Sequence, residues 1–82
     1  MSKRSELEAM IKRAAVAVGH LNAIADDAEA LADEYEESAD NQEEHFPSKA
    51  EIARENAEAV REWAEALRGE AEAIDIEGPE LA

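Results

Sequence analysis

Four consecutive seven-residue units run from Ala50 to Glu77, and each begins with alanine followed by glutamate. The units read AEIAREN, AEAVREW, AEALRGE and AEAIDIE. A seven-residue period is typical of an α-helix that buries one stripe of its surface against a partner helix. The apolar positions of this stripe are Ala53, Val60, Leu67 and Ile74, with Trp63 beside it. The second half of the chain is therefore predicted to form a helix over about residues 49–76.

The first half of the chain has apolar residues with the same period. Two heptad positions form its predicted seam, and a third set flanks them. One position holds Leu7, Ala14, Leu21, Ala28 and Tyr35, the other holds Met10, Ala17, Ile24 and Leu31, and the flanking set is Ile11, Val18, Ala25 and Ala32. This pattern predicts a helix over about residues 6–40. Ser5 with Glu8, and Ser48 with Glu51, have the spacing of capping boxes.

The simplest arrangement of these two segments is an all-α antiparallel helical hairpin in a single domain, residues 1–82, with a loop at 41–48 and a short tail at 77–82. Leucine, isoleucine, valine and phenylalanine together number only 14 residues, against 19 alanines. Such a short chain buries little surface alone. We therefore expect the hairpin to form a homodimer, as a four-helix bundle or a coiled coil, which would cover the exposed side of both seams. Core packing is also expected for Tyr35 and Trp63.

Negative charge is concentrated in the middle of the chain. No lysine or arginine lies between Arg13 and Lys49, whereas ten acidic residues do. Residues 1–24 carry four basic and two acidic side chains, residues 25–46 carry ten acidic ones, and residues 47–82 carry four basic and ten acidic ones. Like charges three or four residues apart on a helix repel by roughly 0.2–0.5 kcal/mol per pair. A run of this kind is either tolerated as a solvated surface or used for binding.

The acidic side chains of the first helix are the predicted partner-binding site. Most of them lie along one outward face, and their own helix places no arginine among them, so we expect them to be unpaired and free to attract a basic surface. The predicted residues are Asp26, Glu29, Asp33, Glu36, Glu37, Asp40, Glu43 and Glu44. The expected partner is a basic, nucleic-acid-binding protein. A net charge of −14 and a pI near 4.3 disfavour direct binding to nucleic acid or to an anionic membrane.

Several chemical functions find no support in the sequence. The chain has no cysteine, which excludes thiolate metal sites and agrees with a reducing cytoplasmic location. Neither His20 nor His45 has a glutamate three residues before it, so the di-iron bundle motif is absent. No glycine-rich phosphate loop or positioned nucleophile is present. We expect no metal, no cofactor, no membrane span and no enzymatic activity.

In size and charge the chain is similar in kind to small acidic inhibitors of phages and mobile elements, including anti-restriction and anti-CRISPR proteins that mimic DNA. This resemblance implies a non-enzymatic inhibitor that docks its acidic helix face where a partner would otherwise bind phosphate. Two alternatives remain open. One is a structural or assembly protein of the helical-bundle kind, in which the acidic surface is only solvated or adapted to high salt. The other is an antitoxin-like binder of a basic toxin.

Overall fold

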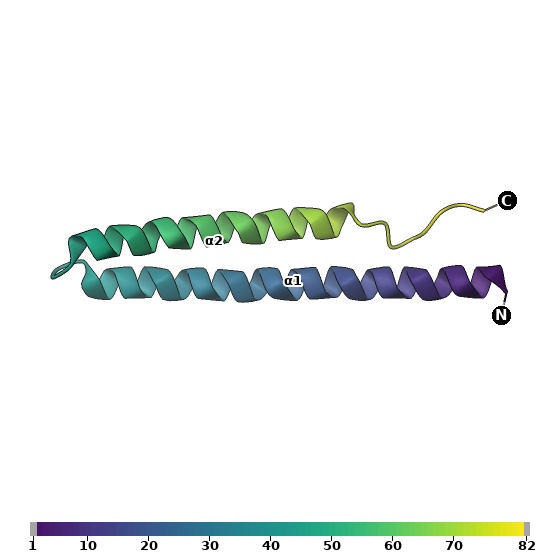
Figure 1. Cartoon of the computed structure of the whole chain (residues 1–82), viewed down its shortest axis with the longest axis horizontal. Coiled ribbons are helices and arrows are strands. Elements are labelled where there is room, and N and C mark those ends of the chain that lie inside the picture. Colours follow the sequence, from purple (N-terminus) through teal and green to yellow (C-terminus); the bar gives the residue numbers. More distant parts are fainter. Residues whose placement is uncertain (1, 82) are drawn as a thin grey trace.

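A computed structural model describes residues 2–81 of the chain, and within this range the chain forms two helices and no strand. The first helix, α1, spans Lys3–Gln42, and the second, α2, spans Pro47–Ala73. They lie antiparallel, with the turn at one end and both termini at the other (Figure 1). The Cα atoms extend over 66 × 17 × 10 Å, so the molecule is a rod. The predicted all-α antiparallel hairpin is confirmed, and the dimer stays a prediction.

Both helices begin earlier than predicted because neither uses the expected capping box. Ser2 is the N-cap of α1, and its hydroxyl oxygen accepts the N–H of Ser5 at 3.1 Å. Helix α2 begins at Pro47, which lacks an N–H group and so suits a first helical turn. The preceding residue, Phe46, makes no side-chain capping hydrogen bond. The boxes predicted at Ser5 and Ser48 are therefore wrong.

Helix α2 ends at Ala73, before the predicted position 76. Beyond it, the Oδ1 atom of Asp75 accepts the N–H groups of Glu77 and Gly78, both at 2.9 Å, and Gly78 has a φ of +84°. These bonds turn the chain out of the helix, since a positive φ suits glycine and is strained for other residues. The connection between the helices is shorter than predicted, residues 43–46. Ala82, the last residue of the predicted tail, lies outside the described residues.

The interface between the helices is built almost entirely from alanine. Among residues 2–81, all nine buried core residues are alanines, and no larger side chain is fully buried. The buried set is Ala25, Ala28, Ala32 and Ala39 on α1, and Ala50, Ala53, Ala57, Ala64 and Ala71 on α2. Val60 and Leu67 are partly buried against one part of this seam, and Tyr35 against another. Burying a methylene-sized group contributes roughly 0.8 kcal/mol, so the core of a single hairpin is small.

The seam of α1 uses a different heptad position from the predicted one. Leu21, Ala28 and Tyr35 do lie on the side of α2, and Leu7, of the same position, lies beside the tail instead. The second position is the set that includes Ala25 and Ala32, which was expected only to flank the seam. Met10, Ile24 and Leu31 are exposed, so their assignment to the seam is wrong. On α2, Trp63 is 54% exposed, and its predicted core role is also wrong. The core role of Tyr35 is confirmed by its contact with the seam.

The N-terminal part of α1 has no helix beside it, because α1 has 40 residues and α2 has 27. Residues 74–81 run along this part instead (Figure 1). A Cβ atom built on Gly78 would lie 2.5 Å from Cδ1 of Ile11, so the tail backbone packs directly on α1. Pro79 and Leu81 line one hollow together with Leu7. The tail thus extends the seam beyond the end of α2.

Candidate functional site

Three arginines of α2 reach across the hairpin, and each binds two carboxylates that lie in α1 or, for Glu43, directly after it. We call this set the ladder. Its members are Arg68 with Asp26 and Glu29, Arg61 with Asp33 and Glu36, and Arg54 with Asp40 and Glu43. We call each arginine with its two acids a rung, so every rung contains one guanidinium group and two carboxylates. The ladder runs along one flank of the alanine seam.

The ladder follows from a shared sequence period. The arginines recur every seven residues on α2, and the pairs of acids, three residues apart, recur every seven residues along α1 and end at its C-cap residue Glu43. Residues three apart lie on the same side of a helix, so one arginine meets both acids of its rung. Each arginine follows a seam residue, Ala53, Val60 or Leu67, and so lies on a flank of α2. Because the helices are antiparallel, the first arginine along the chain, Arg54, pairs with the last two acids, and the last arginine, Arg68, pairs with the first two.

The contacts of the ladder are direct ion pairs. Arg61 donates from Nη2 to Oδ1 of Asp33 at 2.6 Å and from Nη1 to Oε1 of Glu36. Arg68 uses Nη2 for both Asp26, at 2.5 Å, and Glu29, at 3.3 Å. Its Nη1 atom is buried and has no hydrogen-bond partner among the described residues. The Arg68 rung is therefore less completely bonded than the Arg61 rung.

The third rung is the one nearest the turn. Nη2 of Arg54 lies 3.2 Å from Oδ1 of Asp40 and 3.2 Å from Oε2 of Glu43. The carboxylates are the more exposed partners in every rung, and the arginine side chains are 34–42% exposed. Long aliphatic stems of this kind cover apolar surface while the charged end stays near water. The arginines therefore shield the edge of the alanine seam in addition to pairing with acids.

The paired carboxylates raise the pKa of two of these arginines above its ordinary value. For Arg61 the largest cause is the hydrogen bond to Glu36, followed by the bond to Asp33. For Arg54 it is the hydrogen bond to Glu43, followed by the bond to Asp40. Partial desolvation acts in the opposite direction and is the smaller effect. Both guanidinium groups thus stay charged over the whole ordinary pH range.

The expectation that the acids of α1 are unpaired is wrong. Six of the eight predicted partner-binding residues lie in the ladder, and only Glu37 and Glu44 form no ion pair with another of residues 2–81. The three ladder arginines were not among the predicted site residues. Their common seven-residue period with the acids was the signal that could have identified them. Whether the eight residues bind a partner stays a prediction.

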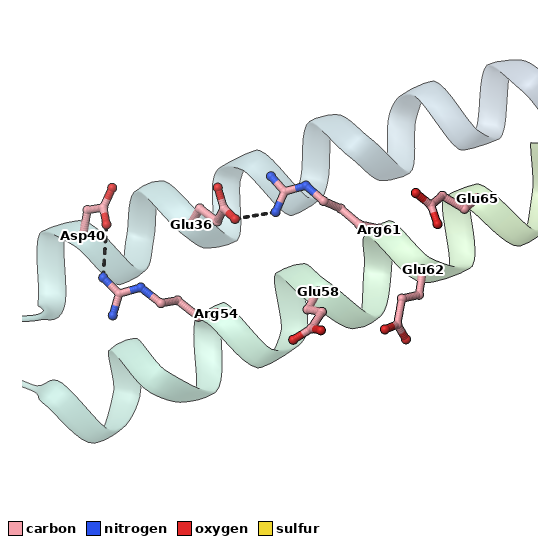
Figure 2. Close-up of a pocket in the computed structure, with 7 residues that line it drawn as sticks. All are labelled: Glu36, Asp40, Arg54, Glu58, Arg61, Glu62 and Glu65. Carbon is pink, nitrogen blue, oxygen red and sulfur yellow. Dashed lines mark hydrogen bonds and ion pairs between the residues drawn. The ribbon is translucent and has the colours of Figure 1, made fainter.

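A groove lies between the helices on the ladder side, with a volume of about 550 Å³. Figure 2 shows Arg54 and Arg61 extending from α2 to meet Asp40 and Glu36, while Glu58 and Glu62 project from α2 without crossing to α1. We call this the acidic groove. Its lining residues are Glu36, Asp40, Arg54, Glu58, Arg61, Glu62 and Glu65. Five carboxylates and two guanidinium groups line it. The two arginines do not balance all of the carboxylates, so the groove has a net negative charge.

The described part of the chain contains no group of three or more acidic or histidine side chains placed to hold a metal ion. Neither helix, over the same residues, has a stretch that is both long and apolar enough to cross a lipid bilayer. Comparisons with protein-family models, with curated proteins and with solved structures give no match for this chain.

Proposed function

We propose that this chain is a non-enzymatic protein-binding module whose acidic groove docks on a basic surface of another protein. The observation that carries the proposal is the negative charge that remains after the arginines are paired. The groove holds three more carboxylates than guanidinium groups. Opposite charge on a partner would raise the rate of encounter and select for basic surfaces.

Three glutamates of the groove have free hydrogen-bonding capacity. Glu58, Glu62 and Glu65 form no ion pair with another of residues 2–81. An ionised carboxylate only accepts hydrogen bonds, and its strongest partners are lysine and arginine. We infer that basic side chains of the partner lie against these three residues. The eight acids predicted from the sequence then supply the surrounding negative field, and the ladder holds six of them in place.

The partner class that fits best is a nucleic-acid-binding protein, because its basic surface is built to receive rows of negative charge. In that case this chain and nucleic acid compete for the same surface. The narrower hypothesis of an anti-restriction or anti-CRISPR inhibitor stays a prediction from size and charge. A structural or assembly role is the second candidate, and the exposed Met10, Ile24 and Leu31 on α1 and Trp63 on α2 support it.

Affinity capture with the immobilised protein tests the leading proposal. A partner retained from a lysate of the source organism should be basic, and duplex DNA should displace it in a competition experiment. The variant that carries Glu58→Gln, Glu62→Gln and Glu65→Gln should bind this partner at least tenfold more weakly. The control carries Glu70→Gln, Glu72→Gln and Glu77→Gln, which changes the net charge equally outside the groove, and should bind like the unchanged protein.

Equal binding by the two triple variants would show that only the overall charge matters and that the groove is not the docking site. A retained partner that DNA does not displace would contradict competition with nucleic acid. Capture of no basic protein at low ionic strength, where electrostatic attraction is strongest, would reject the docking proposal as a whole.

A further inference from the structure

The hairpin has an exposed apolar face on the side opposite the ladder. On α1 this face contains Met10, Ala17, Ile24 and Leu31, which recur every seven residues. Each precedes by one position a residue of the seam set Ile11, Val18, Ala25 and Ala32, so the stripe is turned by about 80° from the centre of the seam. The acids of the ladder are turned from that centre in the opposite direction. Met10 is 58% exposed, and Ile24 and Leu31 are each 44% exposed.

Helix α2 adds an aromatic residue to the same face. Trp63 immediately precedes the buried Ala64, whereas the ladder arginines immediately follow the seam residues Ala53, Val60 and Leu67. At about 100° per residue, these two placements lie on opposite flanks of α2. Trp63 is therefore on the flank away from the ladder, where it continues the stripe of α1. Large apolar side chains gathered on one face of a soluble protein mark an interaction surface.

We propose that a second copy of this chain covers the apolar face, with the two α1 helices packed antiparallel on each other. The stripe is suited to this arrangement because it is centred near the middle of α1, which spans Lys3–Gln42. A twofold axis at the centre of the stripe, between His20 and Leu21, places Met10 opposite Leu31 of the other copy, and Ala17 opposite its Ile24. At each end of the interface Met10 then contacts Leu31, two large side chains. At the centre the small Ala17 contacts the large Ile24, which lets the two helices pack closely.

The charge of α1 selects a second copy and this orientation. Residues 3–20 carry four basic and two acidic side chains, and residues 21–42 carry eight acidic and no basic ones. Antiparallel packing lays the basic half of each α1 along the acidic half of the other copy. Parallel packing would place acidic half on acidic half and cost repulsion. The basic half is the part of α1 along which the tail runs in place of α2 (Figure 1). The tail packs there on the seam residue Ile11, and the stripe residue Met10 remains exposed.

One pair of charges makes the arrangement testable. Arg13 and Asp27 share a heptad position at the edge of the stripe, and neither forms an ion pair with another of residues 2–81. In the antiparallel dimer, Arg13 of one copy lies one residue, about 1.5 Å along the helix axis, from the level of the partner's Asp27, which is close enough for an ion pair, and this pair occurs twice. Within one copy the two residues are 14 positions apart on a single helix, about 21 Å at 1.5 Å per residue. They therefore pair only between copies.

Sedimentation equilibrium of the full chain tests the surface. The unchanged protein should be a dimer at micromolar concentration. Ile24→Lys should raise the dimer dissociation constant by roughly a hundredfold, because the residue occurs twice in a twofold interface and each loss counts for about tenfold. The control is Asn22→Lys, which makes an exposed lysine on the ladder side of the same helix turn and should change the constant by less than about threefold. Circular dichroism checks that both variants keep their helices.

A charge exchange tests the orientation. Arg13→Glu alone and Asp27→Arg alone should each weaken the dimer roughly tenfold, since each places like charges opposite one another twice. The double variant should return to within about threefold of the unchanged protein. A protein that remains monomeric at about 100 µM, an equal effect of Ile24→Lys and Asn22→Lys, or a double variant weaker than both single ones would overturn the proposal. None of these outcomes depends on the acidic groove.

Discussion

Arg61 donates a hydrogen bond from Nη1 to Oε1 of Glu36, although the two residues are 25 positions apart in the chain. This bond and its two neighbouring rungs tie α2 to α1 at regular intervals. A slip of one residue in the antiparallel register would move every arginine away from its two acids at once. The alanine seam alone specifies the register weakly, because its small side chains are nearly identical along the interface. The ladder therefore adds the specificity that the seam lacks.

The ladder should be the part of the structure that responds most to salt. We expect Arg61→Gln to lower the melting temperature at low ionic strength, because Asp33 and Glu36 then repel each other without a counter-charge. The difference from the unchanged protein should shrink at about 1 M salt, where the Debye length falls to about 3 Å. Thermal unfolding followed by circular dichroism measures both values.

The control for this experiment is Lys12→Gln, which removes the same charge from a residue that forms no ion pair with another of residues 2–81. It should have a small effect at either salt concentration. If both variants lower the melting temperature equally, the rungs contribute nothing beyond their charge.

The contribution of the ladder should be independent of pH between about pH 7 and pH 9. The folded-state pKa values of Arg54 and Arg61 are raised by their carboxylate partners. A group with a raised pKa contributes its full stabilisation below the unfolded value and loses it only as pH rises through the folded value. For arginine both lie far above pH 9. The difference in melting temperature between the unchanged protein and Arg61→Gln should therefore be the same at both pH values, and a decline toward pH 9 would contradict it.

The sequence was sufficient to predict the fold and insufficient to select the seam of α1. On α2, the apolar residues Val60 and Leu67 leave one choice of buried stripe. On α1, the positions three and four residues after Leu21, Ile24 and Ala25, are both apolar, and size favoured Ile24. The structure uses Ala25 because small residues let the helices approach closely across the alanines of α2. That choice also turns the acids toward the arginines.

The candidate site was predicted in part, for a related reason. The acids of α1 were found from composition and helical periodicity, but Arg61 lies on the other helix, and its distance from Asp33 depends on the register of the hairpin. A sequence read one helix at a time contains no information on pairs between helices. The two helices have the same seven-residue period, with arginines on one and acids on the other. When they lie antiparallel in the correct register, every arginine therefore meets acids along the whole length of the hairpin.

Replacing a buried alanine of the seam with a larger residue should destabilise the hairpin. Ala64 is fully buried between Ala25 and Ala28, so Ala64→Leu would force the helices apart and should cost about 1–3 kcal/mol of unfolding free energy. The control is Ala15→Leu, which adds the same atoms at an exposed position of α1 and should be close to neutral. Urea denaturation measures both. Equal stability of the two variants would show that the seam is loosely packed.

The three glycines should respond to substitution in opposite ways. Gly19 and Gly69 lie inside helices, and a Cβ atom built on either meets nothing within 4 Å. Gly19→Ala and Gly69→Ala should therefore each stabilise the protein by about 0.5–1 kcal/mol, because alanine loses less backbone entropy on forming a helix.

Gly78 differs from the two helical glycines in backbone conformation and in surroundings, since its φ is +84° and a Cβ atom there would lie 2.5 Å from Cδ1 of Ile11. Gly78→Ala should be destabilising, and urea denaturation of all three variants gives the comparison. A destabilised Gly19→Ala protein would mean that a close contact, absent from the single hairpin, forms at that position, whereas a neutral Gly78→Ala would show that the tail does not pack on α1.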